Sequence, residues 1–199
     1  MKGSIYAVVL AAGRSTRFDG KKLTQNFSGK PLLQHSLAAA QAAFPGRVVL
    51  VVGHASETII ASSGGLADRV VINTRYTEGQ GGSLAAGVRA CRDDADAIVV
   101  MLADQPLITT STLAKLVASW TGKKQHIVAS DYGDSRGPPV LFGKDAFDQL
   151  CELDSDHGAR KVIQSGDFDV ATIAVGSLGF DIDTPQDLEA ASQLLSAEK

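Results

Sequence analysis

Residues 5–22 read IYAVVLAAGRSTRFDGKK, a short apolar run that breaks into a small, basic loop. The run over residues 5–10 has the length and composition of a buried strand. The loop that follows begins with two alanines and a glycine and carries four cations, Arg14, Arg17, Lys21 and Lys22. Small residues let a ligand approach the backbone, and free N–H groups beside cations can hold a polyphosphate. We therefore predict an anion site at the end of this strand. The simpler interpretation is a turn whose cations are solvated.

Composition limits the classes of protein that this chain can be. The 199 residues fit one domain, 1–199, and 44% of them are hydrophobic, which is ample for a core. A net charge of −3 is unlike a general nucleic-acid binder, so we expect no nucleic-acid partner. The two cysteines are isolated, no apolar run is long enough to span a bilayer, and no segment resembles a signal peptide. We therefore expect a cytoplasmic protein without a membrane partner.

Strand-like and helix-like segments alternate along the chain. Apolar runs that predict strands cover residues 5–10, 47–52, 69–72, 97–102, 127–130 and 170–175. Helix-like stretches cover residues 31–43, 56–62, 83–92, 110–120, 144–151, 156–165 and 184–197. Apolar strands between helices predict an α/β fold with a mostly parallel sheet that is covered on both faces. The glycines and prolines of residues 131–143 favour a loop or an edge hairpin rather than a central strand.

Acidic residues follow two of the predicted strands. Asp104 comes after the run over residues 97–102, and ligands of open α/β sheets bind at the carboxyl ends of strands. Asp181 and Asp183 would point the same way on an extended segment, and such a pair suits a hard cation such as Mg²⁺. An Asx-turn or a helix cap explains each of these residues equally well.

A glycine-rich segment over residues 73–87, NTRYTEGQGGSLAAG, precedes a predicted helix that starts near Ser83. The free N–H groups of a helix start can bind a base edge or a phosphate, although an ordinary loop would look the same. The sequence has neither a GxxxxGK[ST] phosphate loop nor a GxGxxG dinucleotide fingerprint, and it lacks a GxSxG hydrolase motif.

Taken in order, the motifs resemble those of the nucleotidyltransferases that activate sugars and cofactors with NTPs. The resemblance runs through LAAGRSTRFDGKK, GKPLLQHSL (29–37), EGQGGSLAAG, LADQP and DIDTPQDL, and so covers nearly the whole chain. Within that family, the chain is most similar to the molybdenum-cofactor cytidylyltransferases and their guanylyltransferase relatives. The resemblance implies a Rossmann-like three-layer α/β/α fold of the glycosyltransferase-A type. Ala12 resembles the cytidine-using enzymes, since the guanosine-using ones tend to carry a glycine there.

The resemblance also implies residue roles. Arg17, Lys22 and Asp104 would be catalytic, with Arg17 on the triphosphate and Lys22 at the reacting α-phosphate. Asp104, with Asp181 or Asp183, would hold Mg²⁺, or alternatively Mn²⁺. The nucleotide-binding residues would be Leu10, Ala11, Ala12, Gly13, Arg14, Ser15, Lys22, Asn73, Gly79, Gly82 and Ser83. The substrates would be CTP and molybdopterin or the molybdenum cofactor, with a molybdoenzyme or its chaperone as a further partner.

The acceptor would bind along residues 131–165. The residues that the resemblance assigns to it are Arg136, Gly137, Pro139, Asp156, His157 and Arg160. The chain departs from the family pattern at Asp19, where glycine is usual, and at Pro138, where the motif GHP has histidine. Alternatives therefore stay open: GTP as donor, a sugar phosphate or phospholactate as acceptor, or a domain repurposed as an oxidoreductase or a maturation chaperone.

Overall fold

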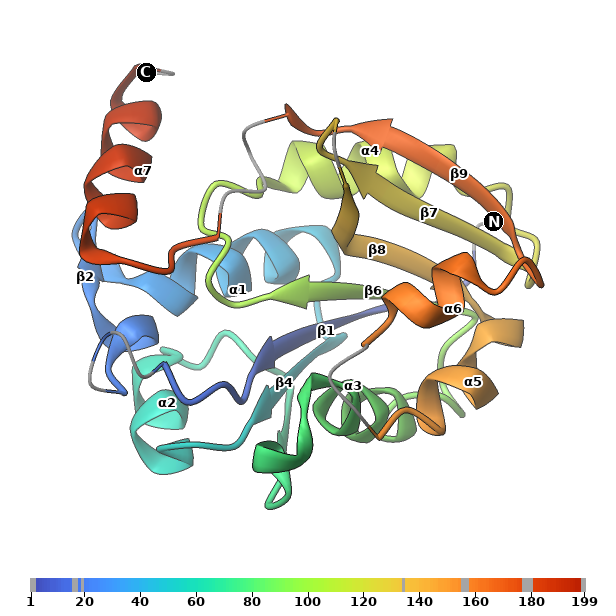
Figure 1. Ribbon diagram of the computed structural model, residues 1–199, viewed down its shortest axis with the longest axis horizontal. Helices are drawn as coiled ribbons and strands as arrows, with labels where there is room; N and C mark the ends of the chain where they lie inside the picture. The colour runs from blue at the N-terminus through green and yellow to red at the C-terminus, as the bar shows by residue number, and fades with distance from the viewer. Residues whose placement is uncertain are drawn as a thin grey trace.

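The protein, described here from a computed structural model, is built on a seven-stranded sheet with the strand order β5-β4-β1-β6-β8-β7-β9 (Figure 1). The structure describes residues 3–15, 18, 20–133, 135–154, 158–176 and 181–197. The seven strands are β1 (Ile5–Ala11), β4 (Val48–Val52), β5 (Arg69–Ile72), β6 (Ala97–Leu102), β7 (His126–Asp131), β8 (Arg136–Gly143) and β9 (Asp169–Ala174). Every neighbouring pair is parallel except those of β8, which runs antiparallel to β6 and β7. The predicted α/β fold with a mostly parallel sheet is confirmed.

Helices cover both faces of this sheet. Buried residues of α1 (Leu32–Ala43), α2 (Ser56–Ser62), α4 (Thr110–Ser119) and α7 (Pro185–Ala197) belong to one hydrophobic cluster. Those of α3 (Gln80–Arg89), α5 (Phe147–Cys151) and α6 (Arg160–Gln164) belong to a second cluster on the opposite face. Short elements complete the chain: the hairpin strands β2 (Asn26–Phe27) and β3 (Lys30–Pro31), and the 3₁₀ helices η2 (Lys22–Thr24), η3 (Tyr76–Glu78) and η4 (Lys144–Ala146).

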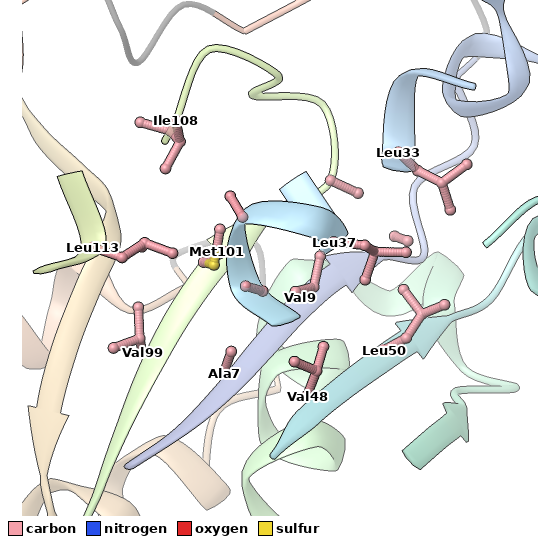
Figure 2. Packing of buried hydrophobic residues seen from close by; sticks show 14 of the residues in the cluster. Ala7, Val9, Leu33, Leu37, Val48, Leu50, Val99, Met101, Ile108 and Leu113 are labelled. Atoms are coloured by element: carbon pink, nitrogen blue, oxygen red, sulfur yellow. The ribbon is translucent and has the colours of Figure 1, made fainter. Parts of the chain in front are cut away.

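Strands β1, β4 and β6 carry only apolar or aromatic residues because both of their faces are covered. In β1, Ala7 and Val9 face the first cluster, whereas Val8 and Leu10 face the second. Figure 2 shows Ala7 and Val9 beside Leu37 of α1, with equivalent residues of β4 and β6 on either side. This double burial explains why the sequence runs lack the alternation of a half-exposed strand.

The prediction that residues 131–143 form a loop or an edge hairpin is wrong. β8 is a central strand, and residues 140–143 pair with β6 on one side. Pro138 and Pro139 lie beyond that pairing, where the β7–β8 register shifts between Ala129 and Ser130. The Ser130 hydroxyl donates to the Pro139 carbonyl at 2.7 Å. Because the prolines fall at this irregularity, the amide hydrogens that they lack are not needed by the ladder.

Two helices begin with side-chain caps. Thr109 caps α4, since its hydroxyl accepts a hydrogen bond from the amide of Thr112. Before α7, the Thr184 hydroxyl accepts from the Asp187 amide, and the Asp187 carboxylate accepts from the Thr184 amide in return. α3 begins at Gln80, three residues before the predicted Ser83. Among the described residues, no helix has both the length and the apolar composition needed to cross a membrane.

Candidate active site

One edge of the sheet gathers the polar loops. β1, β4 and β6 are parallel, so their carboxyl ends meet at that edge, and antiparallel β8 starts there (Figure 1). The loops after β1, β5 and β6 surround a cavity of 520 Å³, which we call the first cavity. Its lining consists of Leu10, Ala11, Ala12, Gly13, Arg14, Ser15, Phe18, Lys22, Leu23, Tyr76, Thr77, Gly79, Gln80, Ser83, Leu102, Asp104 and Asp183.

The loop after β1 forms one wall of the first cavity. All of the predicted residues from Leu10 to Ser15 line it, and so does Lys22. A Cβ atom added to Gly13 would meet no protein atom within 4 Å, so the space beside this backbone is open to a ligand. Arg17, which we predicted to contact a triphosphate, lies outside the described residues.

The segment before α3 forms the opposite wall. Gly79 lies at φ +125° and lines the cavity together with Ser83. Asn73 and Gly82 are not part of the lining. Instead, the Asn73 side chain donates to the Ser83 hydroxyl at 3.0 Å and accepts from the backbone amide of Arg75 at 3.0 Å. Asn73 therefore fixes the loop and orients Ser83.

Several lining residues were missed from the sequence. They are Phe18, Leu23, Tyr76, Thr77, Gln80 and Leu102. Tyr76 and Thr77 lie within the glycine-rich segment, where the glycines were the stronger signal. The structure shows what places Tyr76 there: a Cβ atom at Gly53 would lie 2.5 Å from the Cβ of Tyr76, so the close approach of these two segments requires glycine.

Lys22 joins the acidic residues of two distant segments. Its Nζ lies 2.6 Å from Oδ2 of Asp104 and 3.0 Å from Oδ1 of Asp183, and the residue is only 7% exposed. Burial by itself would lower the pKa of Lys22, but the carboxylates of Asp104 and Asp183 outweigh that effect, so the pKa is raised above its ordinary value. The ammonium group is therefore charged at neutral pH.

Asp181 and Asp183 have different surroundings. Asp183 lines the first cavity, and its amide donates to the Asp187 carboxylate that also caps α7. Asp181 instead accepts a hydrogen bond from Nε2 of Gln105 at 2.9 Å and does not line the cavity. Desolvation and the nearby Asp104 carboxylate raise the pKa of Asp181 to about 6.

The donor set fits a divalent metal ion. Two carboxylates, from Asp104 and Asp183, already hold one cationic atom between them. Mg²⁺ is commonly bound by one or two protein carboxylates together with substrate phosphates. Within the described part of the chain, no group of three or more His, Cys, Asp or Glu residues is arranged to hold a metal.

A second cavity of 510 Å³ adjoins the first, and both are lined by Leu10, Gln80 and Leu102. Three of the residues predicted to bind an acceptor, Arg136, Gly137 and Arg160, line this second cavity. Pro139 does not line it; its carbonyl accepts a hydrogen bond from Ser130, and Pro138 lines the cavity instead. Asp156 and His157 lie outside the described residues. The remaining lining residues are Leu84, Val100, Val140, Gly158, Ala159, Lys161, Ile163 and Gln164.

The amino-acid sequence is similar to those of bacterial proteins that carry different names. Purine catabolism protein PucB of Bacillus subtilis is 29% identical over 96% of this chain and 98% of its own length. Bifunctional protein GlmU of Lactobacillus delbrueckii is 34% identical over 94% of this chain, which spans only 39% of GlmU.

Solved structures show the same fold. Rv0371c from Mycobacterium tuberculosis has a TM-score of 0.84 and 30% identity, over 97% of this chain and 100% of that chain. Its complex with manganese has a TM-score of 0.80 and 28% identity, over 96% of this chain and 98% of that chain. Molybdopterin-guanine dinucleotide biosynthesis protein A from Archaeoglobus fulgidus is 20% identical, with a TM-score of 0.67 over 96% of this chain and 99% of that chain, and shares the fold.

The family match spans most of the sheet and both walls of the first cavity. The family described as the MobA-like NTP transferase domain matches residues 7–170, which run from β1 into β9. This chain therefore belongs to the MobA-like NTP transferase family of nucleotidyltransferases.

Proposed function

We propose that this protein transfers CMP from CTP to the phosphate of molybdopterin or the molybdenum cofactor, with release of pyrophosphate. The observation that carries the proposal is the pair of adjoining cavities that share Leu10, Gln80 and Leu102. One cavity has the small, basic loop suited to a triphosphate, and the other has cations suited to a second anion. Two substrates bound side by side in this way can react directly.

The residues account for catalysis without a protein base. Phosphate oxygens of an acceptor are nucleophilic at neutral pH, so alignment and charge neutralisation are the main requirements. Arg14 and Lys22 line the first cavity and would offset negative charge on the triphosphate, as would Arg17. Asp104 and Asp183 would hold a divalent metal ion, which when bound neutralises phosphate charge. A structure of the relative Rv0371c is a complex with manganese, which favours a divalent metal ion for this chain as well.

The choice of CTP rests on Ala12. This residue lines the first cavity, where the nucleotide is proposed to bind, and it is 6% exposed. Glycine at this position is typical of the guanosine-using relatives, and the added methyl group of alanine narrows the site. A pyrimidine base, which is smaller than a purine base, is therefore the better match to the first cavity.

The second cavity favours an acceptor with an apolar body and an anionic group. Leu84, Val100, Val140 and Ile163 give it apolar walls. Arg136, Arg160 and Lys161 add three cations to the lining. A phosphorylated fused-ring acceptor, which can lay its flat faces against apolar walls, fits this chemistry better than a sugar phosphate, whose hydroxyl groups would need polar partners along the walls.

The decisive experiment measures pyrophosphate release with Mg²⁺, each of the four NTPs, and molybdopterin or its molybdenum form. We expect release with CTP, a loss of kcat of roughly 10²–10³ in Lys22→Ala, and no turnover in Asp104→Ala. Release with GTP alone would correct the donor, and release only with a sugar phosphate or phospholactate would correct the acceptor. A Lys22→Ala effect below about threefold would remove Lys22 from the mechanism.

No release with any NTP and any of these acceptors would contradict the transferase proposal. In that case, flavin or nicotinamide absorbance of the purified protein would indicate a repurposed oxidoreductase. Nucleotide binding without turnover would instead fit a maturation chaperone.

A further inference from the structure

The Lys22 ammonium lies at the position that a divalent ion between Asp104 and Asp183 would need. It contacts one oxygen of each carboxylate, at 2.6 and 3.0 Å. A Mg²⁺ ion takes its oxygen ligands at about 2.0–2.1 Å, and Mn²⁺ favours the same oxygen ligands. An ion that used both of these oxygens would therefore collide with the ammonium group and repel its charge.

Lys22 is also held firmly in this place. The residue is 7% exposed and begins η2, so its backbone is fixed next to the cavity. Two carboxylates satisfy the ammonium group where little water reaches it. If the ammonium group moves away from the two carboxylates, its charge is left unpaired unless another anion replaces them. An unpaired buried charge destabilises the folded protein.

We propose that Lys22 competes with the metal ion for Asp104 and Asp183, and that the nucleotide triphosphate resolves the competition by drawing the ammonium group away. This inference rests on the proposed function, which assigns the metal ion to these two carboxylates. Without a nucleotide, Lys22 closes the metal site. With a nucleotide, the phosphates accept the ammonium group, and the carboxylates become available to the metal ion.

The geometry supplies the partner that this exchange requires. Lys22 lines the first cavity together with the basic loop of residues 10–15, so its side chain already borders the space proposed for the triphosphate. Phosphate oxygens provide both a new partner for the ammonium group and further ligands for the metal ion. Metal ion and nucleotide then bind with positive coupling, and each raises the affinity of the other by the same factor.

The test measures Mn²⁺ binding directly, by the electron paramagnetic resonance signal of free Mn²⁺, with and without α,β-methylene-CTP. We expect Lys22→Met to bind Mn²⁺ at least about tenfold more tightly than the wild type when nucleotide is absent, since a neighbouring positive charge is removed. The analogue should tighten Mn²⁺ binding strongly in the wild type and much less in Lys22→Met.

Matched variants separate this competition from a general charge effect. Lys22→Arg keeps the charge and should bind Mn²⁺ as weakly as the wild type. Lys21→Met removes one positive charge from the exposed neighbouring residue and leaves the ion pairs of Lys22 with Asp104 and Asp183 in place, so it should leave Mn²⁺ affinity unchanged. Adding Asp104→Asn to Lys22→Met should abolish the gain, because the site itself is lost.

Equal Mn²⁺ affinities of the wild type and Lys22→Met without nucleotide would overturn the inference. If the wild type then still released pyrophosphate from CTP, the proposed function would survive without the competition. If Asp104→Asn left the tighter binding of Lys22→Met intact, the metal ion would bind elsewhere, and both the inference and the metal assignment would be wrong. Should Lys22→Met fail to fold in a thermal unfolding assay, Lys22→Gln provides the same comparison.

Discussion

Replacing Asp104 by asparagine should destabilise the ligand-free protein more than the same change at Asp183. Both residues contact Lys22, but their environments differ. The side chains of Lys22 and Asp104 are 9% and 24% exposed, whereas that of Asp183 is 55% exposed. The shorter contact, at 2.6 Å, is also the one to Asp104.

The size of the effect follows from these differences. Removing one partner of a fully buried ion pair costs about 3–5 kcal/mol. The remaining Asp183, the partial hydration of Asp104 and the amide oxygen of asparagine reduce the expected loss for Asp104→Asn to about 2 kcal/mol. A chain of this length loses roughly 2–4 °C in Tm for each kcal/mol, so Tm should fall by about 4–8 °C. Asp183→Asn should cost less than about 1 kcal/mol, as exposed pairs do.

Thermal unfolding near pH 7, in buffer with EDTA and without nucleotide, measures both variants against the wild type. Chelation matters because a bound metal ion would mask the ion pair. The reasoning is refuted if Asp104→Asn leaves Tm within about 1 °C of the wild type, or if Asp183→Asn lowers it as much.

Three further outcomes follow. Gly87→Ala should lower the urea midpoint by the equivalent of about 1–2 kcal/mol, because the new Cβ would lie 2.4 Å from Cγ1 of Val8; an unchanged midpoint would contradict this. Asp181→Asn should raise Tm near pH 8 but not near pH 4. Folding raises the pKa of Asp181 to about 6, so the charged carboxylate lowers the stability of the folded protein above that pH. This loss of stability disappears at lower pH, where the carboxylate is protonated. A Tm difference between Asp181→Asn and the wild type that grew toward acid pH would contradict the raised pKa of Asp181. Arg160→Gln should raise the KM for the acceptor about tenfold and leave the KM for CTP unchanged, and equal changes in both would remove Arg160 from the acceptor site.

The sheet could be predicted from the sequence because strands depend on local signals, and apolar runs marked them. The basic loop could be placed directly after β1 for the same reason, and in the structure it lines the first cavity. The carboxyl ends of parallel strands meet at one edge, so the sequence alone places Asp104 near that loop.

Long-range details could not be predicted in this way. Lys22 contacts Asp104 and Asp183 across 82 and 161 residues of sequence, and no local pattern encodes such a contact. The sequence also left Asp181 and Asp183 equivalent, whereas their separate partners, Gln105 and Lys22, distinguish them.

Strand β8 is an exception to the rule that proline does not occur in a central strand. Two prolines argue against a central strand, but the rule concerns residues that must donate to the ladder. Pro138 and Pro139 lie at a register shift beyond the β6 pairing, so the strand tolerates them. Only the three-dimensional register reveals that position.

The most direct test of the account follows the label of radioactive CTP. With the acceptor and Mg²⁺ present, α-³²P label should appear in a dinucleotide product, while γ-³²P label should appear in pyrophosphate, as attack on the α-phosphorus requires. Transfer of the γ label to the acceptor, or release of the α label only as free CMP, would contradict nucleotidyl transfer in the two adjoining cavities.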